Sequence, residues 1–392
     1  MNLSLYFKKF FNNSQASGII LIFCVLISLL IANSSLAETF QHFLDKVIGT
    51  HLFGLEYPVS IWINDGLMAV FFLLVGLEIK RELVEGELSS FKNASLPIFA
   101  AVGGMLVPAV IYSIFNAGTE YSNGWGIPMA TDIAFSLAII SMLGKKIPNS
   151  IKIFLAALAI VDDLGAILVI AIFYTEQIHW TYLLLSLGVT ALLFILNFLK
   201  VTRTIFYIIP GLFLWYFLHH SGIHATIAGV LLAFSIPTNA SNVEISPLEK
   251  LEHQLHIPVS FMIMPIFALT NTNITFSNEM VEGITSTLGL GIICGLILGK
   301  LIGINLFSLI AIKLKLSSLP QNSNWVQMIG VGLLAGIGFT MSIFIALLSF
   351  KDEILIQDEA KFAILIASFI AAIAGFIILS MSSKGNMEPE ED

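Results

Sequence analysis

The sequence ALAIVDDLGA, residues 157–166, places two adjacent aspartates inside a long apolar run. The run extends from Ile151 to Tyr174, and as a helix rising about 1.5 Å per residue it is long enough to cross the roughly 30 Å hydrocarbon core of a membrane. Asp162 and Asp163 are the twelfth and thirteenth of its twenty-four residues, so we expect them at the middle of the bilayer. A carboxylate at that depth costs about 2.5–3.5 kcal/mol on insertion scales and usually marks an ion or proton pathway. This stretch therefore predicts a membrane-spanning helix that carries the functional centre.

The two neighbouring aspartates cannot form one symmetric clamp, because adjacent helical positions point about 100° apart. Each carboxylate therefore needs a partner of its own, or one of them holds a proton. A buried Asp in a helical bundle can also be only a structural hydrogen-bonding group. Two in succession favour the functional interpretation.

The composition is that of a membrane-embedded chain. Of the 392 residues 57% are hydrophobic and 11% charged, and the mean hydropathy is +0.92, whereas about 25% of the residues of a soluble domain are charged. The two cysteines lie in apolar segments and predict neither a disulfide framework nor a metal site. No long polar block divides the chain, so we expect one integral-membrane domain over residues 1–392, with a short N-terminus (1–16) and an acidic tail (384–392). The expected surroundings are the lipid bilayer, and nothing predicts binding of nucleic acid.

Apolar runs predict an all-α polytopic membrane protein with about twelve transmembrane helices, a count that depends on two short segments, 204–219 and 223–236. We interpret the first run as an uncleaved signal anchor, although residues 35–37 resemble a cleavage site. Residues 47–57 are too short and too polar to span, and predict a small extramembrane β-hairpin near 45–58 or a loop. The runs are 17–32, 60–79, 94–115, 124–144, 151–174, 181–198, 204–219, 223–236, 256–271, 284–312, 326–350 and 357–382.

The basic residues predict the orientation of these helices. With the N-terminus placed inside, fourteen of the 18 Lys and Arg residues fall in cytoplasmic segments, three fall outside, and Lys300 lies within a span. Because an excess of Lys and Arg in cytoplasmic loops sets membrane topology, we expect both termini in the cytoplasm and an even number of spans.

Two spans contain helix-breaking residues. The stretch GWGIPMATD, residues 124–132, has two glycines and a proline just before a third intramembrane aspartate, and GLLAGIGFT, residues 332–340, has three glycines. Unwound backbone at membrane depth persists only where protein or a water-filled cavity satisfies its polar groups, and interrupted spans in corresponding positions of two halves point to a transporter's binding site. Transmembrane glycines also serve close helix packing. The proline and the aspartate of the first stretch favour the functional interpretation.

Four ionisable residues lie near the middle of predicted spans: Asp132, Asp162, Asp163 and Lys300. Oxygen ligands suit hard cations, and Thr131 can add a hydroxyl beside the first of these aspartates. A carboxylate can hold either a proton or a metal ion, and its surroundings decide the balance between them. Competition of two ions for one site that opens to each side of the membrane in turn is the minimal form of antiport.

A second charged group lies at the predicted cytoplasmic ends of two spans. Glu78 and Glu82 form an i, i+4 pair, and Glu252, His253 and His256 cluster at the start of a later span. The histidines lack the His-Glu-x-x-His arrangement of zinc enzymes, so we expect no zinc there. A solvated helix end accounts for such a cluster, and a charged entrance with titrating histidines, acting as a pH sensor, is the functional alternative.

With these residues in hand, the chain resembles the NhaA family of bacterial Na⁺/H⁺ antiporters over essentially its whole length. The resemblance rests on matching stretches in the same order, namely VGLEIKRE at 75–82, ATD at 130–132, DDLG at 162–165, LEHQLHIP at 251–258 and the span around Lys300. It implies inverted repeats, an established architecture of that family, with two broken helices that cross at mid-membrane. It implies exchange of cytoplasmic Na⁺ or Li⁺ for external H⁺ by alternating access, electrogenic and activated at alkaline pH, in the bacterial inner membrane and without a cofactor.

The resemblance also assigns roles to residues. Asp163 would be the principal Na⁺ ligand and Asp162 the second, paired with Lys300 in some states. The cost of an unpaired ammonium within a span leaves Asp132 as the alternative partner of that lysine. Asp132 and Lys300 would offset the half-helix dipoles at the crossing. The family's pH-response region corresponds to Glu78, Glu82, Glu252, His253 and His256. The hairpin would join two copies in a homodimer, whereas the acidic tail has no family explanation and is expected to be disordered.

Three other functions fit parts of the pattern. An intramembrane aspartyl protease needs two aspartates on separate facing helices, whereas Asp162 and Asp163 are neighbours on one helix. A sodium-coupled solute symporter would need a cavity for an organic solute, which a sequence does not reveal. A channel is disfavoured, because exchange requires a closed site that opens to each side of the membrane in turn. The aspartate pair, the broken spans and Lys300 together favour an antiporter.

Overall fold

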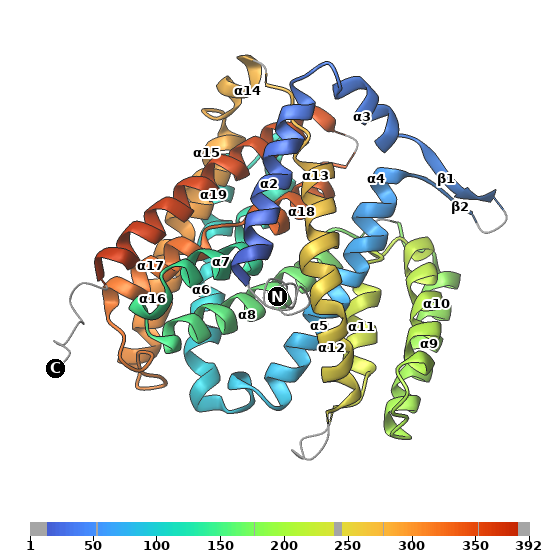
Figure 1. Cartoon of the computed structure of the whole chain (residues 1–392), viewed down its shortest axis with the longest axis horizontal. Coiled ribbons are helices and arrows are strands. Elements are labelled where there is room, and N and C mark those ends of the chain that lie inside the picture. The colour runs from blue at the N-terminus through green and yellow to red at the C-terminus, as the bar shows by residue number, and fades with distance from the viewer. Residues whose placement is uncertain are drawn as a thin grey trace, which may run out of the picture. The chain divides into compact units, whose positions relative to one another are not determined.

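The computed structural model of the protein describes residues 14–51, 54–175, 177–238, 245–276, 278–351 and 353–382. Helices dominate these residues (Figure 1). The acidic tail and nearly all of the predicted cytoplasmic N-terminus lie outside the described residues.

The helices match the predicted spans. Among the described residues eight helices are long and apolar enough to cross a membrane, and two further pairs, each bent by 43° at a short break, make up to ten. The two short predicted segments are also helical, as α10 (Ile205–Ser221) and α11 (Ile227–Ser235). A helix satisfies its own backbone hydrogen bonds, which is why apolar segments take this form in lipid. The prediction of an all-α polytopic membrane protein is confirmed.

The chain folds into two compact units, each assembled from segments far apart in the sequence. Unit 1 takes residues up to Ile19, residues Ser90–Ala166 and residues from Phe276 onward, and unit 2 takes the remainder. The single integral-membrane domain over 1–392 stays a prediction. The helices of unit 1 are α6 (Phe91–Asn116), η4 (Glu120–Met129), α7 (Ile133–Met142), η5 (Gly144–Lys146), α8 (Asn149–Phe173, through Ala166), α14 (Asn278–Gly283), α15 (Thr287–Cys294), η7 (Gly295–Gly299), α16 (Lys300–Lys313), α17 (Trp325–Ala335), α18 (Phe339–Ser349) and α19 (Ile354–Ser382).

Unit 2 contains the long spans on either side of the hairpin and the two shorter apolar helices. Its elements are most of α2 (Ser14–Ala32), α3 (Ala37–Leu44), β1 (Val47–Thr50), β2 (Leu55–Pro58), α4 (Val59–Ile61), η2 (Trp62–Leu67), α5 (Met68–Val84), η3 (Glu87–Ser89), the end of α8, α9 (Trp180–Phe198), α10, α11, α12 (Pro247–Pro258), η6 (Val259–Ile263) and α13 (Met264–Asn271).

In unit 1, close contacts at glycine residues bring α16 and the preceding segment η7 against α6. A Cβ on Gly103 would lie 2.2 Å from the carbonyl oxygen of Gly303, and a Cβ on Gly299 would lie 2.7 Å from the Cα of Pro108. Small residues let transmembrane backbones approach this closely. The contact fixes the depth and the rotation of α16, and therefore the position of Lys300 at its first residue.

The predicted hairpin is present as an antiparallel pair in which Thr50 faces Leu55. Its first strand is exposed along its whole length. Gly49 has a positive φ of 133°, and a Cβ there would lie 1.7 Å from the carbonyl oxygen of Leu55. Only glycine fits this position, which explains one of the two glycines that interrupt the strand-like sequence.

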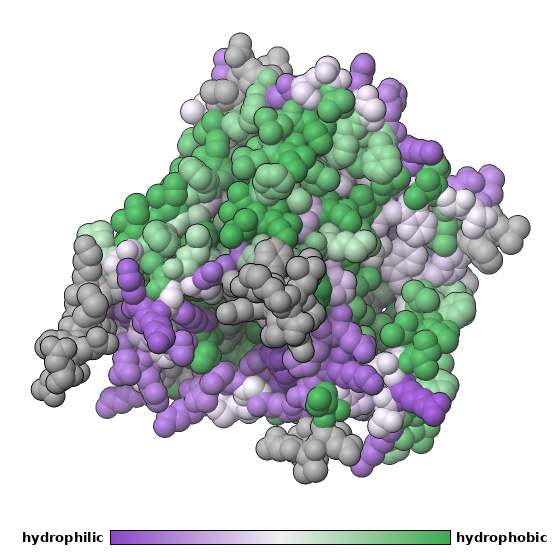
Figure 2. Space-filling view, in the orientation of Figure 1, coloured by the Kyte–Doolittle hydropathy of each residue, from purple (hydrophilic) through white to green (hydrophobic). Residues whose placement is uncertain are grey.

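Exposed hydrophobic residues cover the outer faces of the long helices. On α19, for example, Phe369 is 68% exposed and Met381 69%. The same character extends along α2, where Leu30 is 72% exposed, and Figure 2 shows both helices under a largely hydrophobic surface. Apolar surface of this extent is suited to lipid.

Candidate functional site

Both aspartates of the opening stretch are buried in unit 1. The helix α8 continues through them without a break, and Asp162 and Asp163 are 0% and 1% exposed. A Cβ on Gly165 would lie 2.1 Å from the sulfur of Met105, so this glycine lets α6 approach α8 beside the pair. Two carboxylates are thus fixed in the interior on a rigid helix.

Lys300 forms an ion pair with Asp162. Its ammonium donates to Oδ2 of Asp162, and both side chains are 0% exposed. The lysine follows the wide-turn segment η7, Gly295–Gly299, and short insertions of this kind are frequent at functional sites. A buried ion pair is retained only where each charge has its partner, because removing one partner typically costs about 3–5 kcal/mol.

The hydroxyl of Thr131 has two acceptors and a single proton. Its Oγ1 lies 2.7 Å from Oδ2 of Asp162 and 2.8 Å from the carbonyl oxygen of Ala335 at the end of α17. A hydroxyl donates one hydrogen bond, so it serves the carboxylate or the carbonyl but not both at once. Thr131 therefore connects the charge state of Asp162 to the second broken helix.

Asp132 closes the N-terminal ends of two half-helices. Its Oδ1 accepts from the N–H of Phe135 at 3.0 Å, which caps α7. Its Oδ2 accepts from the N–H of Thr340 at 3.2 Å and from the hydroxyl of the same residue, both at the start of α18. A negative charge is favourable at each of these helix N-termini. Asp132 thus neutralises two helix ends at once, and the ion pair of Lys300 is with Asp162 instead.

Two serines fasten the broken helices to each other in a reciprocal pattern. Ser136, on the second half of the first broken helix, donates to the carbonyl of Leu334 at 2.9 Å. Ser342, on the second half of the other, donates to the carbonyl of Ile127 at 2.7 Å. At the centre the N–H of Asp132 donates to the carbonyl of Ile337 at 2.7 Å. These bonds satisfy unwound backbone in the interior, as required where water is absent.

The centre leaves one carboxylate oxygen available. Oδ1 of Asp162 is buried and accepts no hydrogen bond from the described residues. Among those residues no three His, Cys, Asp or Glu side chains come close enough to hold a metal ion together. Two carboxylates and a nearby hydroxyl can still offer oxygen to a hard monovalent cation, which does not require three acidic ligands. The arrangement fits transient occupation by an ion better than a permanent metal site.

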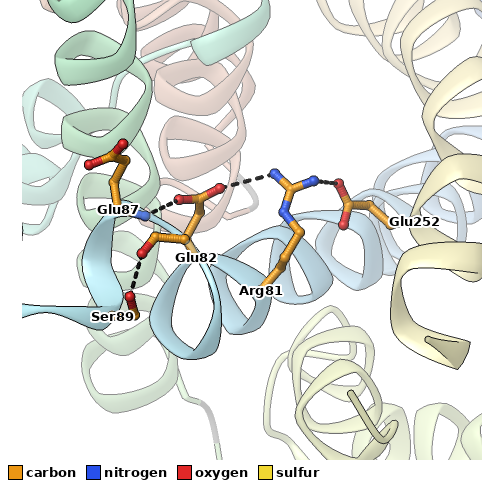
Figure 3. A network of polar contacts seen from close by, with 6 residues as sticks. Arg81, Glu82, Glu87, Ser89 and Glu252 are labelled. Carbon is orange, nitrogen blue, oxygen red and sulfur yellow. Dashed lines mark hydrogen bonds and ion pairs between the residues drawn. The ribbon is translucent and has the colours of Figure 1, made fainter. Parts of the chain in front are cut away.

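The second predicted cluster is assembled in unit 2 around an arginine (Figure 3). Arg81 donates to Oε1 of Glu252 at 2.6 Å and to Oε1 of Glu82 at 3.1 Å. Oε2 of Glu82 accepts in turn from the N–H of Glu87 at 3.0 Å, and the hydroxyl of Ser89 closes the same turn on the carbonyl of Gly86 at 2.6 Å. An ion pair thereby joins the last turns of α5 to the middle of α12.

Not every predicted residue enters this network. Glu78 is half-buried on α5, and His253 and His256 are exposed on α12. The nearby Lys80 on the same helix as Glu78 donates from its ammonium to the carbonyl of Phe234, at 2.8 Å, and to that of Ile236, at the end of α11.

Sequence reasoning missed several residues of both clusters. Arg81 entered the prediction only as part of the stretch at 75–82, and the capping role of Thr340 was not predicted. The equal spacing of Thr131–Phe135 and Thr340–Phe344 was the available signal for the latter. No sequence pattern indicated that Ser136 and Ser342 join the two broken helices, because a serine in an apolar helix can equally well donate a hydrogen bond to the backbone of its own helix.

A sequence profile of the family described as Na⁺/H⁺ antiporter 1 matches residues 8–379. The Na(+)/H(+) antiporter NhaA 2 of Flavobacterium johnsoniae is 58% identical over 97% of the chain and 94% of its own length. The Na(+)/H(+) antiporter NhaA of Flavobacterium psychrophilum is 52% identical over 99% of each chain, and that of Cytophaga hutchinsonii is 48% identical over 100% of this chain and 99% of its own.

Proposed function

The chain belongs to the Na⁺/H⁺ antiporter 1 family of secondary transporters, and from this premise we propose that it exchanges cytoplasmic Na⁺ or Li⁺ for external H⁺ by alternating access. The proposal extends to electrogenic exchange, activation at alkaline pH, and residence in the bacterial inner membrane with both termini in the cytoplasm. A homodimer joined through the exposed strand β1 is part of it.

The observation that carries the proposal is the ion pair of Lys300 with Asp162, next to Asp163 and beside the meeting point of two broken helices. A cation that binds between the carboxylates competes with the ammonium for Asp162. Entry of Na⁺ releases Lys300, which then gives up its proton, and Asp163 gives up a second. Two protons therefore exchange for one Na⁺, and each cycle moves net charge.

The structure supports a link between this site and the opening of the transporter. When Asp162 is charged and holds no cation, the hydroxyl of Thr131 stabilises it. When a cation or a proton occupies Asp162, the same hydroxyl turns to the carbonyl of Ala335. The end of α17 thus gains or loses a hydrogen bond with the occupancy of the site.

Replacing Thr131 with Val tests this link, because valine keeps the shape and loses the hydroxyl. We expect the KM for Na⁺ to fall, by up to about tenfold (about 1.4 kcal/mol), because the hydrogen bond lost from the charged, cation-free Asp162 is stronger than the one lost from the carbonyl of Ala335 in the occupied state. The measurement is the Na⁺ dependence of pH change in proteoliposomes. The matched control is Thr272→Val, which removes an equally buried hydroxyl that bonds only the carbonyl of Ala268, at 2.7 Å in α13. An unchanged KM in Thr131→Val would contradict the link.

Replacing Glu252 with Gln tests the proposed pH response. Acid protonates this carboxylate and releases Arg81, so the neutral amide imitates the acid state. We therefore expect the midpoint of activation to move about one pH unit toward alkali, because a part-buried charge pair is worth about 1.4 kcal/mol, while the maximal rate stays within about twofold. Transport rate against pH in proteoliposomes measures both quantities.

The control for that experiment is Glu249→Gln on the same helix. Glu249 closes a capping box with Ser246, and Gln serves this role as well as Glu. The control removes the same charge without touching Arg81. A variant of Glu252 with an unchanged midpoint and only a reduced rate would show that the sensor lies elsewhere.

The experiment that tests the function as a whole is Na⁺-driven pH change in proteoliposomes of the purified chain. We expect the pH inside the proteoliposomes to rise or fall according to the direction of the imposed Na⁺ gradient. A response that requires an organic solute would instead indicate a symporter.

A further inference from the structure

An apolar cavity of about 360 Å³ lies within unit 2, and the proposed antiport mechanism does not use it. Four helical segments form its walls: η2 continuing into α5, then α10, α11 and α12. Its lining contains no ionisable side chain, and the only polar atoms of its side chains are the indole N–H groups of two tryptophans. The lining residues are Trp62, Gly66, Ala69, Val70, Leu73, Ile208, Gly211, Leu212, Trp215, Ala228, Gly229, Leu232, Leu251 and Leu255.

The cavity is long and follows the helix axes. Its residues on η2 and α5 recur every three or four positions from Trp62 to Leu73, which is the spacing of one helix face. Those eleven steps cover about 16 Å at 1.5 Å per residue. One leaflet of a bilayer has a hydrocarbon depth of about 15 Å, half of the full core. This wall of the cavity therefore spans about the depth of one leaflet.

One end of the cavity carries aromatic and polar groups. Trp62 and Trp215 stack at a centroid distance of 5.9 Å, and Trp215 stacks in turn on His219 at 5.4 Å. Nδ1 of His219 lies 3.5 Å from Oδ2 of Asp65, and the ring of Tyr57 packs edge-on against the same histidine at 4.9 Å. Tryptophan and tyrosine gather where the hydrocarbon of a membrane meets its headgroups.

The Tyr57 ring adds a neutral donor to this end. Burial, followed by the nearby Asp65 carboxylate, raises the pKa of the Tyr57 phenol, so the hydroxyl stays protonated. The opposite end, at Leu73, Leu251 and Leu255, is formed by aliphatic side chains alone. The polarity of the cavity thus changes along its length as it does along a phospholipid.

We propose that this cavity binds one acyl chain of a membrane phospholipid. The chain runs from the tryptophan pair toward Leu73, and its ester end lies beside His219 and Asp65. Access is from the surrounding lipid past Leu212, which is 65% exposed on the outer face of α10. An empty space of this size would leave its walls without contacts on one side, and a hydrocarbon chain restores them.

Gly66 allows the cavity to be filled without disturbing its walls. A Cβ on this glycine would meet only the ring of Trp62, at 3.6 Å, which is ordinary contact. Gly66→Leu therefore places an aliphatic side chain where the acyl chain would lie. The matched control is Gly188→Leu in α9, where a Cβ meets nothing within 4 Å and no part of the cavity is touched.

The test is quenching of tryptophan fluorescence by a brominated lipid. The chain has five tryptophans, so three are first replaced by Phe (Trp125, Trp180 and Trp325) to leave only the pair at the cavity. The protein is reconstituted in phosphatidylglycerol vesicles with a rising fraction of the same lipid brominated at carbons 6 and 7 of its acyl chains. Brominated and unbrominated chains compete equally for the cavity, so its occupancy follows the mole fraction, and the signature of a bound chain is deeper quenching. In fully brominated lipid we expect the two tryptophans to be quenched beyond the level that contact with surface lipid alone produces in Gly66→Leu.

This additional quenching is expected to disappear in Gly66→Leu and to persist in Gly188→Leu. Ala69→Leu, at the next position on the same wall, is a second blocking variant should Gly66→Leu not be recovered folded. Quenching in the unblocked protein no deeper than in the blocking variants would overturn the proposal. So would a loss of quenching in Gly188→Leu equal to that in Gly66→Leu. Transport activity is not a readout, so the result is independent of the proposed antiport.

Discussion

Replacing Asp163 with Asn is expected to abolish Na⁺/H⁺ exchange while leaving membrane insertion intact. The carboxylate is 1% exposed on an unbroken helix, so it contributes to the site rather than to the surface. Asparagine has nearly the same size but can neither carry the proton nor offer a charge to Na⁺. Because removal of a buried charge relieves a desolvation cost, the variant should fold at least as well as the original. Transport in proteoliposomes should fall to the background of protein-free vesicles.

The conservative variant Asp163→Glu separates loss of charge from loss of position. It keeps the carboxylate and moves it by one methylene, so we expect residual exchange with a raised KM for Na⁺. Thermal unfolding of both variants in detergent checks that each is folded. Exchange at the original rate by the Asn variant would mean that the cation binds elsewhere.

Removing both members of the buried ion pair is expected to cost less stability than removing either one. Asp162→Asn alone leaves the ammonium of Lys300 without its charge partner, and Lys300→Gln alone leaves the carboxylate, at a typical cost of about 3–5 kcal/mol each. The double variant buries two neutral groups that can hydrogen-bond to each other. Its melting temperature should therefore exceed that of both single variants.

The same double variant tests whether the ion pair carries charge. If the second proton of each cycle is released from Lys300, any exchange that remains in its absence moves no net charge. The measurement is Na⁺ flux in proteoliposomes under an imposed membrane potential, with the original protein as the voltage-sensitive reference. A double variant that still responds to the potential would show that the second proton travels by another route, and a melting temperature below that of both single variants would show that the pair is not the source of their instability.

The sequence alone determined the class of the fold and the location of the site. Apolar runs of membrane length permit only helices in lipid, because the backbone must satisfy its own hydrogen bonds there. Glycine and proline in residues 124–132 and glycine in residues 332–340 located both breaks, which the structure places at 130–132 and 336–338. The sequence identified Asp162, Asp163 and Lys300 because an ionisable group in the middle of an apolar span has an unfavourable free energy of insertion. That free energy follows from the residue type and its position in the span, without knowledge of the fold.

Only the tertiary structure decided which groups meet. Lys300 could have paired with any of three aspartates, and the close glycine packing of α6 and α16, which no single helix encodes, turns it toward Asp162. Asp132 was predicted beside a break but serves both half-helices because Thr340 lies against it across a sequence distance of 208 residues. In the same way the apolar cavity arises from four helices whose facing small and aliphatic residues each look like ordinary membrane sequence. The insertion cost of a charge and the periodicity of apolar residues are local properties that can be read from the chain. Ion pairs and enclosed cavities depend on helix packing, which only the folded protein specifies.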